Sequence, residues 1–65
     1  MKPLVSVCIC TYNAENYIAE TLETVINQTY KNMEILILDQ NSSDKTPDII
    51  MDYVKKDDRI TLFSL

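Results

Sequence analysis

The stretch Ile35-Leu36-Ile37-Leu38-Asp39 decides how this chain folds. Four consecutive apolar residues, two of them β-branched, predict a short strand that is buried on both faces, and Asp39 ends it abruptly. Strands of this kind belong to parallel sheets, in which helices connect one strand to the next. We therefore expect further strands on either side of this stretch, each separated from it by a helix.

Two other apolar runs are predicted to be strands. Residues Leu4–Cys10 are β-branched and nearly all apolar, whereas Ile60–Phe63 form a shorter and weaker run. The segment between the first two strands has one apolar stripe at helical spacing, with Asn16 as the expected N-cap. The residues of the stripe are Ile18, Leu22, Val25 and Ile26.

The segment before the last strand is predicted to be a second helix. Thr46 is its expected cap, Pro47 occupies a position where a missing N–H costs nothing, and Lys55 and Lys56 lie at the negative end of the helix dipole. The apolar residues Ile49, Ile50, Tyr53 and Val54 should form its buried face. A polar stretch, 57–59, then leads into the third strand.

The order β-α-β-α-β predicts an α/β fold, the opening half of a Rossmann-like sheet with three parallel strands. Right-handed crossovers and the strand order three-two-one place both helices on one face of the sheet. The opposite face is then bare although its residues are apolar, so we expect an incomplete domain that hides this face by self-association. Residues 1–65 are accordingly interpreted as one truncated domain.

Composition excludes several classes of protein. The 65 residues carry a net charge of −4, which argues against a nucleic-acid partner. The absence of Gly excludes the Walker loop and the dinucleotide fingerprint, and the absence of His removes the commonest metal ligand. Cys8 and Cys10 are expected to be buried thiols of a cytoplasmic protein, and no stretch is long enough to span a membrane.

Ligands of open α/β sheets bind beyond the carboxyl ends of the strands. Here those ends carry Thr11-Tyr12-Asn13 and the loop Asp39-Gln40-Asn41-Ser42-Ser43-Asp44, which offer an aromatic face, hydroxyls, amides and a carboxylate. This set suits a nucleoside, with Tyr12 stacking on the base and Asp39 accepting a hydrogen bond from a base N–H or a ribose hydroxyl. Alternatively, Asp39 is a turn carboxylate that binds its own backbone, and Tyr12 is a packing residue.

Three stretches in this order, Val5–Asn13, Ile26–Tyr30 and Glu34–Thr46, resemble the N-terminus of a family 2 glycosyltransferase of the GT-A fold. The resemblance covers essentially all 65 residues. It implies an N-terminal nucleotide-binding segment of an enzyme that transfers a sugar, usually with inversion, from a nucleotide diphosphate donor to a sugar or lipid-linked acceptor. The resemblance implies that the nucleotide, often a uridine nucleotide, is held by Thr11, Tyr12, Asn13, Asp39 and Gln40.

The chain departs from that family at three positions. Many members have Pro in place of Cys10, an Asp in place of Gln40 and a Gly in place of Asn41. Asn tolerates positive φ better than most residues, so we expect the turn at Asn41 to survive. The loss of the second carboxylate at Gln40 affects nucleotide preference more than the fold.

The parts that this segment lacks limit what it can do alone. The family binds Mn²⁺ or Mg²⁺ through a D-x-D motif further along the chain, where a later carboxylate is the catalytic base, and no D-x-D occurs here. We therefore expect no metal ligands or catalytic residues in this segment, and no activity. A non-catalytic module that self-associates or binds a partner is the main alternative. A receiver-like domain would need paired carboxylates after the first strand, and a dehydrogenase or methyltransferase would need Gly there.

Overall fold

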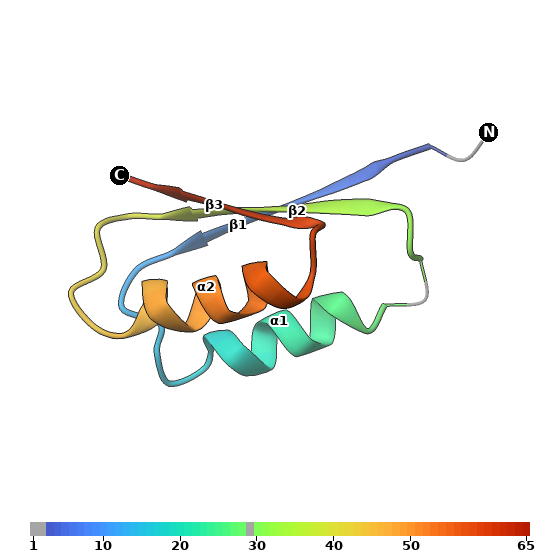
Figure 1. Ribbon diagram of the computed structural model, residues 1–65. Helices are drawn as coiled ribbons and strands as arrows, with labels where there is room; N and C mark the ends of the chain where they lie inside the picture. The colour runs from blue at the N-terminus through green and yellow to red at the C-terminus, as the bar shows by residue number, and fades with distance from the viewer. Residues whose placement is uncertain (1–2, 29) are drawn as a thin grey trace.

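A parallel three-stranded sheet forms one layer of the molecule and two helices form the other (Figure 1). The structure is a computed structural model that describes residues 3–28 and 30–65. Its elements are β1 (Val5–Thr11), α1 (Ile18–Ile26), β2 (Met33–Asp39), α2 (Thr46–Lys56) and β3 (Ile60–Ser64). The predicted β-α-β-α-β order is confirmed. Thr29, within one of the motif stretches named above, lies outside the described residues.

The sheet has the order β1-β2-β3, so β2 is the central strand. Both pairings are parallel, and in the first of them Val7 lies beside Ile35 and Thr11 beside Asp39. This is the predicted strand order, and it brings the carboxyl ends of β1 and β2 together. A one-residue shift would turn every side chain of β1 to the other face, so the register also decides which side chains meet at these ends.

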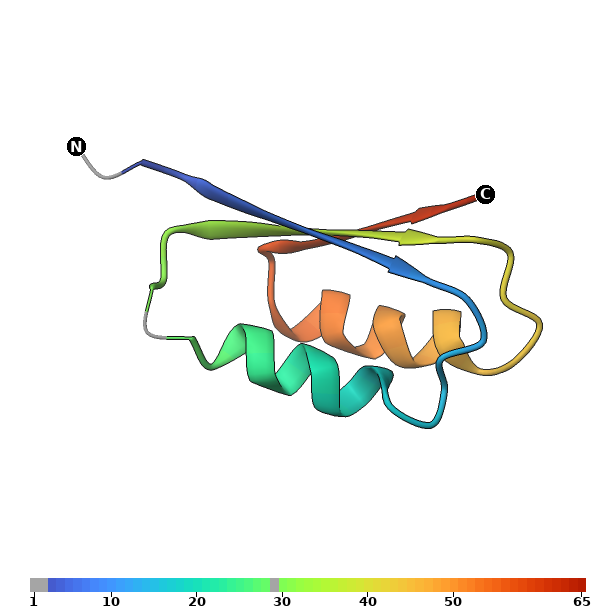
Figure 2. The same cartoon turned by 180° about the vertical axis from the view of Figure 1, so that it is seen from behind.

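Both helices cover the same face of the sheet, as predicted and as the two opposite views show (Figures 1 and 2). Alternate residues of β2 point into the layer between sheet and helices, and Ile35 and Ile37 there are fully buried against Leu22 of α1 and Ile50 of α2. Neither helix in the described part of the chain is long and apolar enough to cross a membrane.

The start of α1 differs from the prediction. Asn16 is not the N-cap, because the helix begins at Ile18, Tyr17 occupies the cap position, and no side chain caps it. The carbonyl of Ala14 instead accepts hydrogen bonds from the amides of Tyr17 and Ile18, at 3.0 and 2.9 Å. A main-chain turn therefore satisfies an amide that would otherwise need a side-chain cap.

The start of α2 differs in a similar way. Thr46 is the first helical residue and not the cap, and Oδ1 of Asp44 accepts the hydrogen bond from its amide at 2.9 Å. A carboxylate in this position is favourable, because the N-terminal end of a helix carries a partial positive charge. Lys55 and Lys56 lie in the last turn, where their charge is favourable as predicted.

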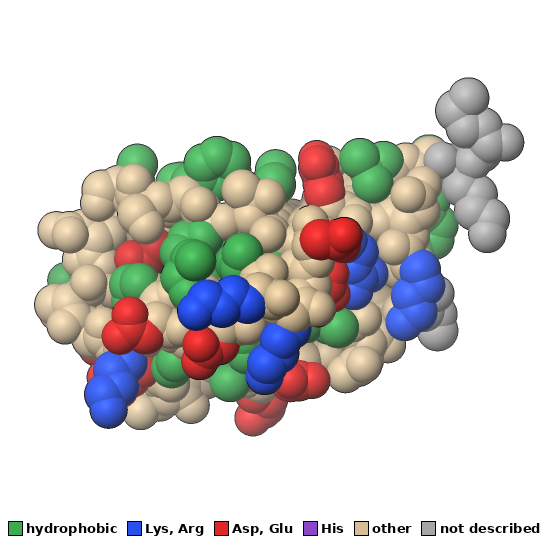
Figure 3. All heavy atoms as spheres, in the orientation of Figure 1, with side chains coloured by type: hydrophobic (Ala, Val, Ile, Leu, Met, Phe, Trp, Pro, Cys, Tyr) green, Lys and Arg blue, Asp and Glu red, His purple; other side chains and the backbone are tan. Residues whose placement is uncertain are grey.

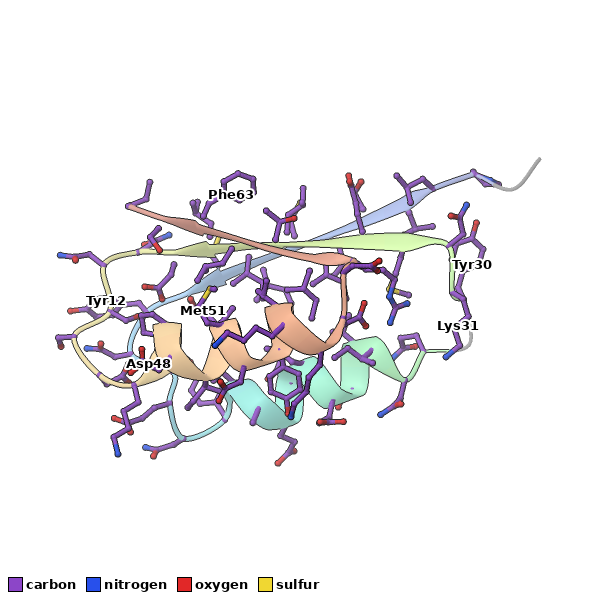
Figure 4. All side chains as sticks on the ribbon, in the orientation of Figure 1. Tyr12, Tyr30, Lys31, Asp48, Met51 and Phe63 are labelled. Carbon is purple, nitrogen blue, oxygen red and sulfur yellow. The ribbon has the colours of Figure 1, made fainter. Side chains whose placement is uncertain are left out.

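The sheet face opposite the helices is bare, as the topology predicted. The open face is formed by Ser6, Cys8 and Cys10 of β1, Glu34, Leu36 and Leu38 of β2, and Thr61 and Phe63 of β3. Cys8 and Cys10 are exposed and not buried as expected, because no layer packs on this face among the described residues. Phe63 is 51% exposed and points away from the helices, and hydrophobic side chains line this side of the molecule (Figures 3 and 4).

Candidate functional site at the carboxyl ends of β1 and β2

The carboxyl ends of β1 and β2 lie side by side and continue into two neighbouring loops, 12–17 and 40–45 (Figure 1). We call this part of the molecule the carboxyl edge. The amide of Gln40 donates to the carbonyl oxygen of Thr11 at 2.9 Å, so the pairing of the two strands extends to the first residue of the second loop. The predicted site residues of both strands therefore meet at one place.

Asp39 is buried at the centre of the carboxyl edge, with only 1% of its surface exposed. Its Oδ1 accepts hydrogen bonds from Oγ1 of Thr11 at 2.7 Å and from Oγ of Ser42 at 2.6 Å. Its Oδ2 accepts a third hydrogen bond, from the amide of Ser42 at 3.1 Å. The contact with the Ser42 amide is the turn interaction that the sequence left open as the alternative for Asp39.

These contacts decide the ionisation of Asp39. Burial by itself would raise the pKa of the carboxyl group, because it disfavours the charged form. The hydrogen bonds from Ser42 and Thr11 outweigh burial and hold the pKa of Asp39 below its ordinary value. Asp39 is therefore a carboxylate at neutral pH, and its negative charge organises the donors around it.

Thr11 is buried like Asp39, with 5% of its surface exposed, whereas the other three predicted site residues are exposed. Tyr12 is 62% exposed and lies at the same end of the molecule as the start of α2 (Figure 4). Asn13 and Gln40 are exposed as well. The alternation of the strands accounts for the difference, because Asp39 continues the series of β2 side chains that face the helices, whereas Gln40 follows it on the other parity.

Ser42 belongs to the loop that the sequence placed at the site, but its contacts with Asp39 and Asn13 were not predicted. It binds both oxygens of Asp39, and its Oγ also accepts a hydrogen bond from the amide of Asn13 at 2.9 Å. A Ser three residues after a strand-ending Asp was the available signal, because Asp side chains often bind backbone amides of the turn that follows. The link to Asn13 had no signal, since the two residues are distant in sequence.

Two asparagines supply the backbone conformations that Gly would otherwise provide. Asn41 has φ of 56° and Asn13 has φ of 48°, both in the left-handed region. The expectation that Asn41 would tolerate positive φ is confirmed, and Asn13 adopts the same conformation in the other loop. Both loops can therefore turn sharply although the chain has no Gly.

The residues of the carboxyl edge do not form a metal site by themselves. Within residues 3–28 and 30–65, no group of three or more His, Cys, Asp or Glu side chains could hold a metal ion.

Removing the Thr11 hydroxyl should change both the ionisation of Asp39 and the stability of the fold. In Thr11→Val the pKa of Asp39 should rise, because one of the hydrogen bonds that lower it is lost while the burial remains. The free energy of unfolding should fall by about 1.5–3 kcal/mol at neutral pH, the range for a hydrogen bond to a charged group. Carboxyl titration by NMR and denaturant unfolding measure the two effects.

The pH dependence of stability follows from the same shift. Because the pKa of Asp39 is lower in the folded chain than in the unfolded chain, its stabilising effect is complete above about pH 4 and is lost as the pH falls further. Ser6→Ala removes an exposed hydroxyl from the same strand and is the matched control. A titration of Asp39 that is identical in Thr11→Val and Ser6→Ala would contradict the assigned role of Thr11.

Comparison with known proteins agrees with this geometry. The profile of the family described as "Glycosyl transferase family 2" matches residues 6–65. An uncharacterized glycosyltransferase of Haemophilus influenzae is 47% identical over 62 residues, which are 95% of this chain and 19% of that protein. A Bacillus subtilis glycosyltransferase named for teichuronic acid biosynthesis is 46% identical over 59 residues, 91% of this chain and 23% of that protein.

A similar solved structure extends the comparison to three dimensions. A mannosyltransferase from Pyrobaculum calidifontis, in complex with GDP-Man and Mn²⁺, matches with a TM-score of 0.86 and 28% sequence identity, covering 98% of this chain and 20% of that one. The chain thus spans about a fifth of the length of these relatives. Because the family profile covers nearly the whole chain, and because the fold and the motif stretches agree with it, the chain belongs to glycosyl transferase family 2.

Proposed function

We propose that the carboxyl edge binds the nucleoside part of a nucleotide-sugar donor, and that the parent enzyme transfers the sugar to an acceptor hydroxyl. The observation that carries the proposal is the junction of Thr11 and Asp39, which joins two loops beside an exposed Tyr12 ring. Membership in a glycosyltransferase family supports transfer, and the complex of the similar mannosyltransferase with GDP-Man supports a nucleotide-sugar donor.

The exposed and the buried residues of the edge have different tasks in this proposal. The Tyr12 ring offers a face on which a base can stack, and Gln40 offers an amide donor and acceptor. Asn13 offers its amide N–H groups, because its Oδ1 already accepts from Ser43. The buried hydrogen bond between Thr11 and Asp39 joins the carboxyl ends of β1 and β2. Direct contact between Asp39 and a base N–H stays a prediction, since only 1% of the surface of Asp39 is exposed.

We propose uracil as the base. The amide of Gln40 can pair with an N–H and a neighbouring carbonyl oxygen at once, a pair of groups that both uracil and guanine present. The choice of uracil rests on the resemblance to the family, whereas the similar mannosyltransferase was solved with a guanosine nucleotide. Parallel titrations with UDP and GDP distinguish the two bases.

Replacing Tyr12 should weaken nucleotide binding without unfolding the chain. The affinity of Tyr12→Ala for UDP should fall by about 1–3 kcal/mol, the usual value of stacking a base on an aromatic side chain. Gln40→Ala should lose about 0.5–1.5 kcal/mol, the value of a hydrogen bond between neutral groups. NMR titration of the chain with UDP measures both affinities.

Tyr17 offers a matched control for this experiment. It is a second exposed tyrosine in the same loop, 58% exposed, and it precedes α1. Tyr17→Ala should bind UDP as the unmodified chain does. Equal affinities of all the variants would remove Tyr12 and Gln40 from the nucleotide site, and tighter binding of GDP than UDP would contradict the assignment of uridine.

The transfer reaction is proposed for the parent enzyme and not for these residues alone. A departing nucleoside diphosphate develops negative charge, which a divalent cation commonly stabilises. The described residues do not fit such a cation, although the similar mannosyltransferase was solved with Mn²⁺. We propose that the rest of the enzyme supplies the metal ligands and the catalytic base. We also propose that transfer inverts the sugar carbon and that the rest of the enzyme binds the acceptor.

The segment by itself should bind the donor without consuming it. Incubation with a UDP-sugar and Mn²⁺ should release no UDP above the level without protein, because the sequence contains no D-x-D motif. Measurement of UDP by anion-exchange chromatography tests this. Turnover that is abolished in Tyr12→Ala would show that the segment contains a complete catalytic site.

A second candidate function is favoured by one observation, the open face. Its exposed Phe63, together with Leu36 and Leu38 of the central strand, forms an apolar surface that could associate with a second copy of the chain. We propose that the isolated segment self-associates through this face. In this second function the segment is a non-catalytic module that acts through contact at the open face and binds no nucleotide.

Sedimentation velocity over a range of concentrations tests the self-association. The unmodified chain should sediment faster as its concentration rises, and Phe63→Ser should suppress this change because it removes the most exposed aromatic ring of the open face. Met51→Ser is the matched control, because Met51 is an exposed apolar residue of α2, 41% exposed, away from that face (Figure 4). A monomer at every concentration would rule out the association.

A further inference from the structure

Three successive backbone amides of the β1–α1 loop, those of residues 13–15, donate to side chains of the segment 42–46. The bonds run from Asn13 N to Ser42 Oγ (2.9 Å), from Ala14 N to Thr46 Oγ1 (2.7 Å) and from Glu15 N to Asp44 Oδ2 (3.2 Å). The accepting residues are at alternate positions of the chain. We call Ser42, Asp44 and Thr46 the loop clasp.

The hydroxyl groups of the loop clasp are fixed by carboxylates on their other side. Ser42 Oγ donates to Oδ1 of Asp39 at 2.6 Å, and Thr46 Oγ1 donates to Oδ1 of Asp44 at 2.5 Å. Each hydroxyl thus accepts from one loop amide and donates to one carboxylate, which uses its only proton and orients its lone pairs. Thr46 is fully buried. Two short relays therefore connect the β1–α1 loop to ionised side chains.

Tyr12 lies between the two fixed ends of this arrangement. On one side of it, Thr11 is paired with β2 and bonded to Asp39. On the other side, Asn13 is held through its amide by Ser42, and its Oδ1 accepts from the amide of Ser43 at 2.9 Å. The backbone on both sides of Tyr12 is therefore restrained, although its ring is exposed.

The same bonds decide which part of a ligand the loop can take. Successive free amides at the end of a strand form a concave site for phosphate groups. Here the amides of residues 13–15 are already used by the loop clasp. The loop is thus unavailable as a phosphate cradle and presents the Tyr12 ring instead, which suits the nucleoside end of a nucleotide.

We propose that Ser42, Asp44 and Thr46 are positioning residues of the nucleotide site, which hold residues 13–15 so that the Tyr12 ring stays in place to receive a base. This inference rests on the proposed function and extends it to three residues that do not themselves contact the ligand. Preorganisation of this kind raises affinity because the loop loses less conformational freedom when the ligand binds.

The test uses Ser42→Ala with Ser42→Thr as its conservative partner. Ser42→Ala removes the relay to Asn13, so the affinity for UDP should fall by about 3- to 30-fold while the chain stays folded. Hydrogen exchange of the Asn13 amide should become faster at the same time. Ser42→Thr keeps the hydroxyl and should restore both properties, and Ser6→Ala, which removes an exposed hydroxyl of β1, should change neither.

A double-mutant cycle with Tyr12 separates positioning from a general loss of stability. If Ser42 acts through Tyr12, adding Ser42→Ala to Tyr12→Ala should reduce UDP affinity by less than about 2-fold, because the ring that it positions is already absent. Thr46→Val is not used as the main variant, because it would leave the amide of Ala14 unpaired in a buried position.

The outcomes distinguish the two levels of the proposal. If the unmodified chain binds UDP and Ser42→Ala binds it equally well despite faster exchange at Asn13, the positioning role is wrong and the proposed function stands. If Ser42→Ala lowers UDP affinity by the same factor in the unmodified chain and in Tyr12→Ala, the positioning role is also wrong. If the unmodified chain binds neither UDP nor GDP, the proposed function fails, and the positioning role fails with it.

Discussion

The carboxylate of Asp39 is the group on which the arrangement of the carboxyl edge depends. A buried charge is costly unless hydrogen bonds replace the water that it loses. Thr11 and Ser42 provide those bonds, and they come from the neighbouring strand and from the loop that follows β2. Satisfying one buried charge therefore also fixes the end of β1 against the end of β2.

The loops at this edge obtain their shape without a single Gly. Asn13 and Asn41 adopt the left-handed backbone conformation, and Ser42 and Thr46 each connect a loop amide to a carboxylate. Loops that bind phosphate commonly leave their amides free for the ligand. Here side chains use them, so the loop gains rigidity and gives up a phosphate site, which is consistent with a role at the nucleoside end of the donor.

One face of the sheet is buried and the other is exposed. One face packs on α1 and α2 through fully buried residues such as Ile35 and Ile37 of the central strand, whereas the other exposes Cys8, Cys10 and Phe63. Two helices that follow right-handed crossovers in one direction along a sheet can cover only one of its faces. No buried side-chain nitrogen or oxygen among the described residues lacks a hydrogen-bond partner even so. The contacts at the carboxyl edge come from β1, β2 and the segment leading into α2.

The sequence by itself determined the order of strands and helices, the parallel sheet, the single helical layer and the family, because these follow from apolar periodicity, connection length and linear motifs. It also determined that Asn41 could replace Gly in a turn. Only the tertiary structure decided that Asp39 points inward while Gln40 is exposed, because an apolar strand such as 35–38 has no alternation from which its faces can be read. The loop clasp, too, could be found only in the tertiary structure. Its bonds join residues about 30 positions apart, which only the packed sheet brings within hydrogen-bond distance.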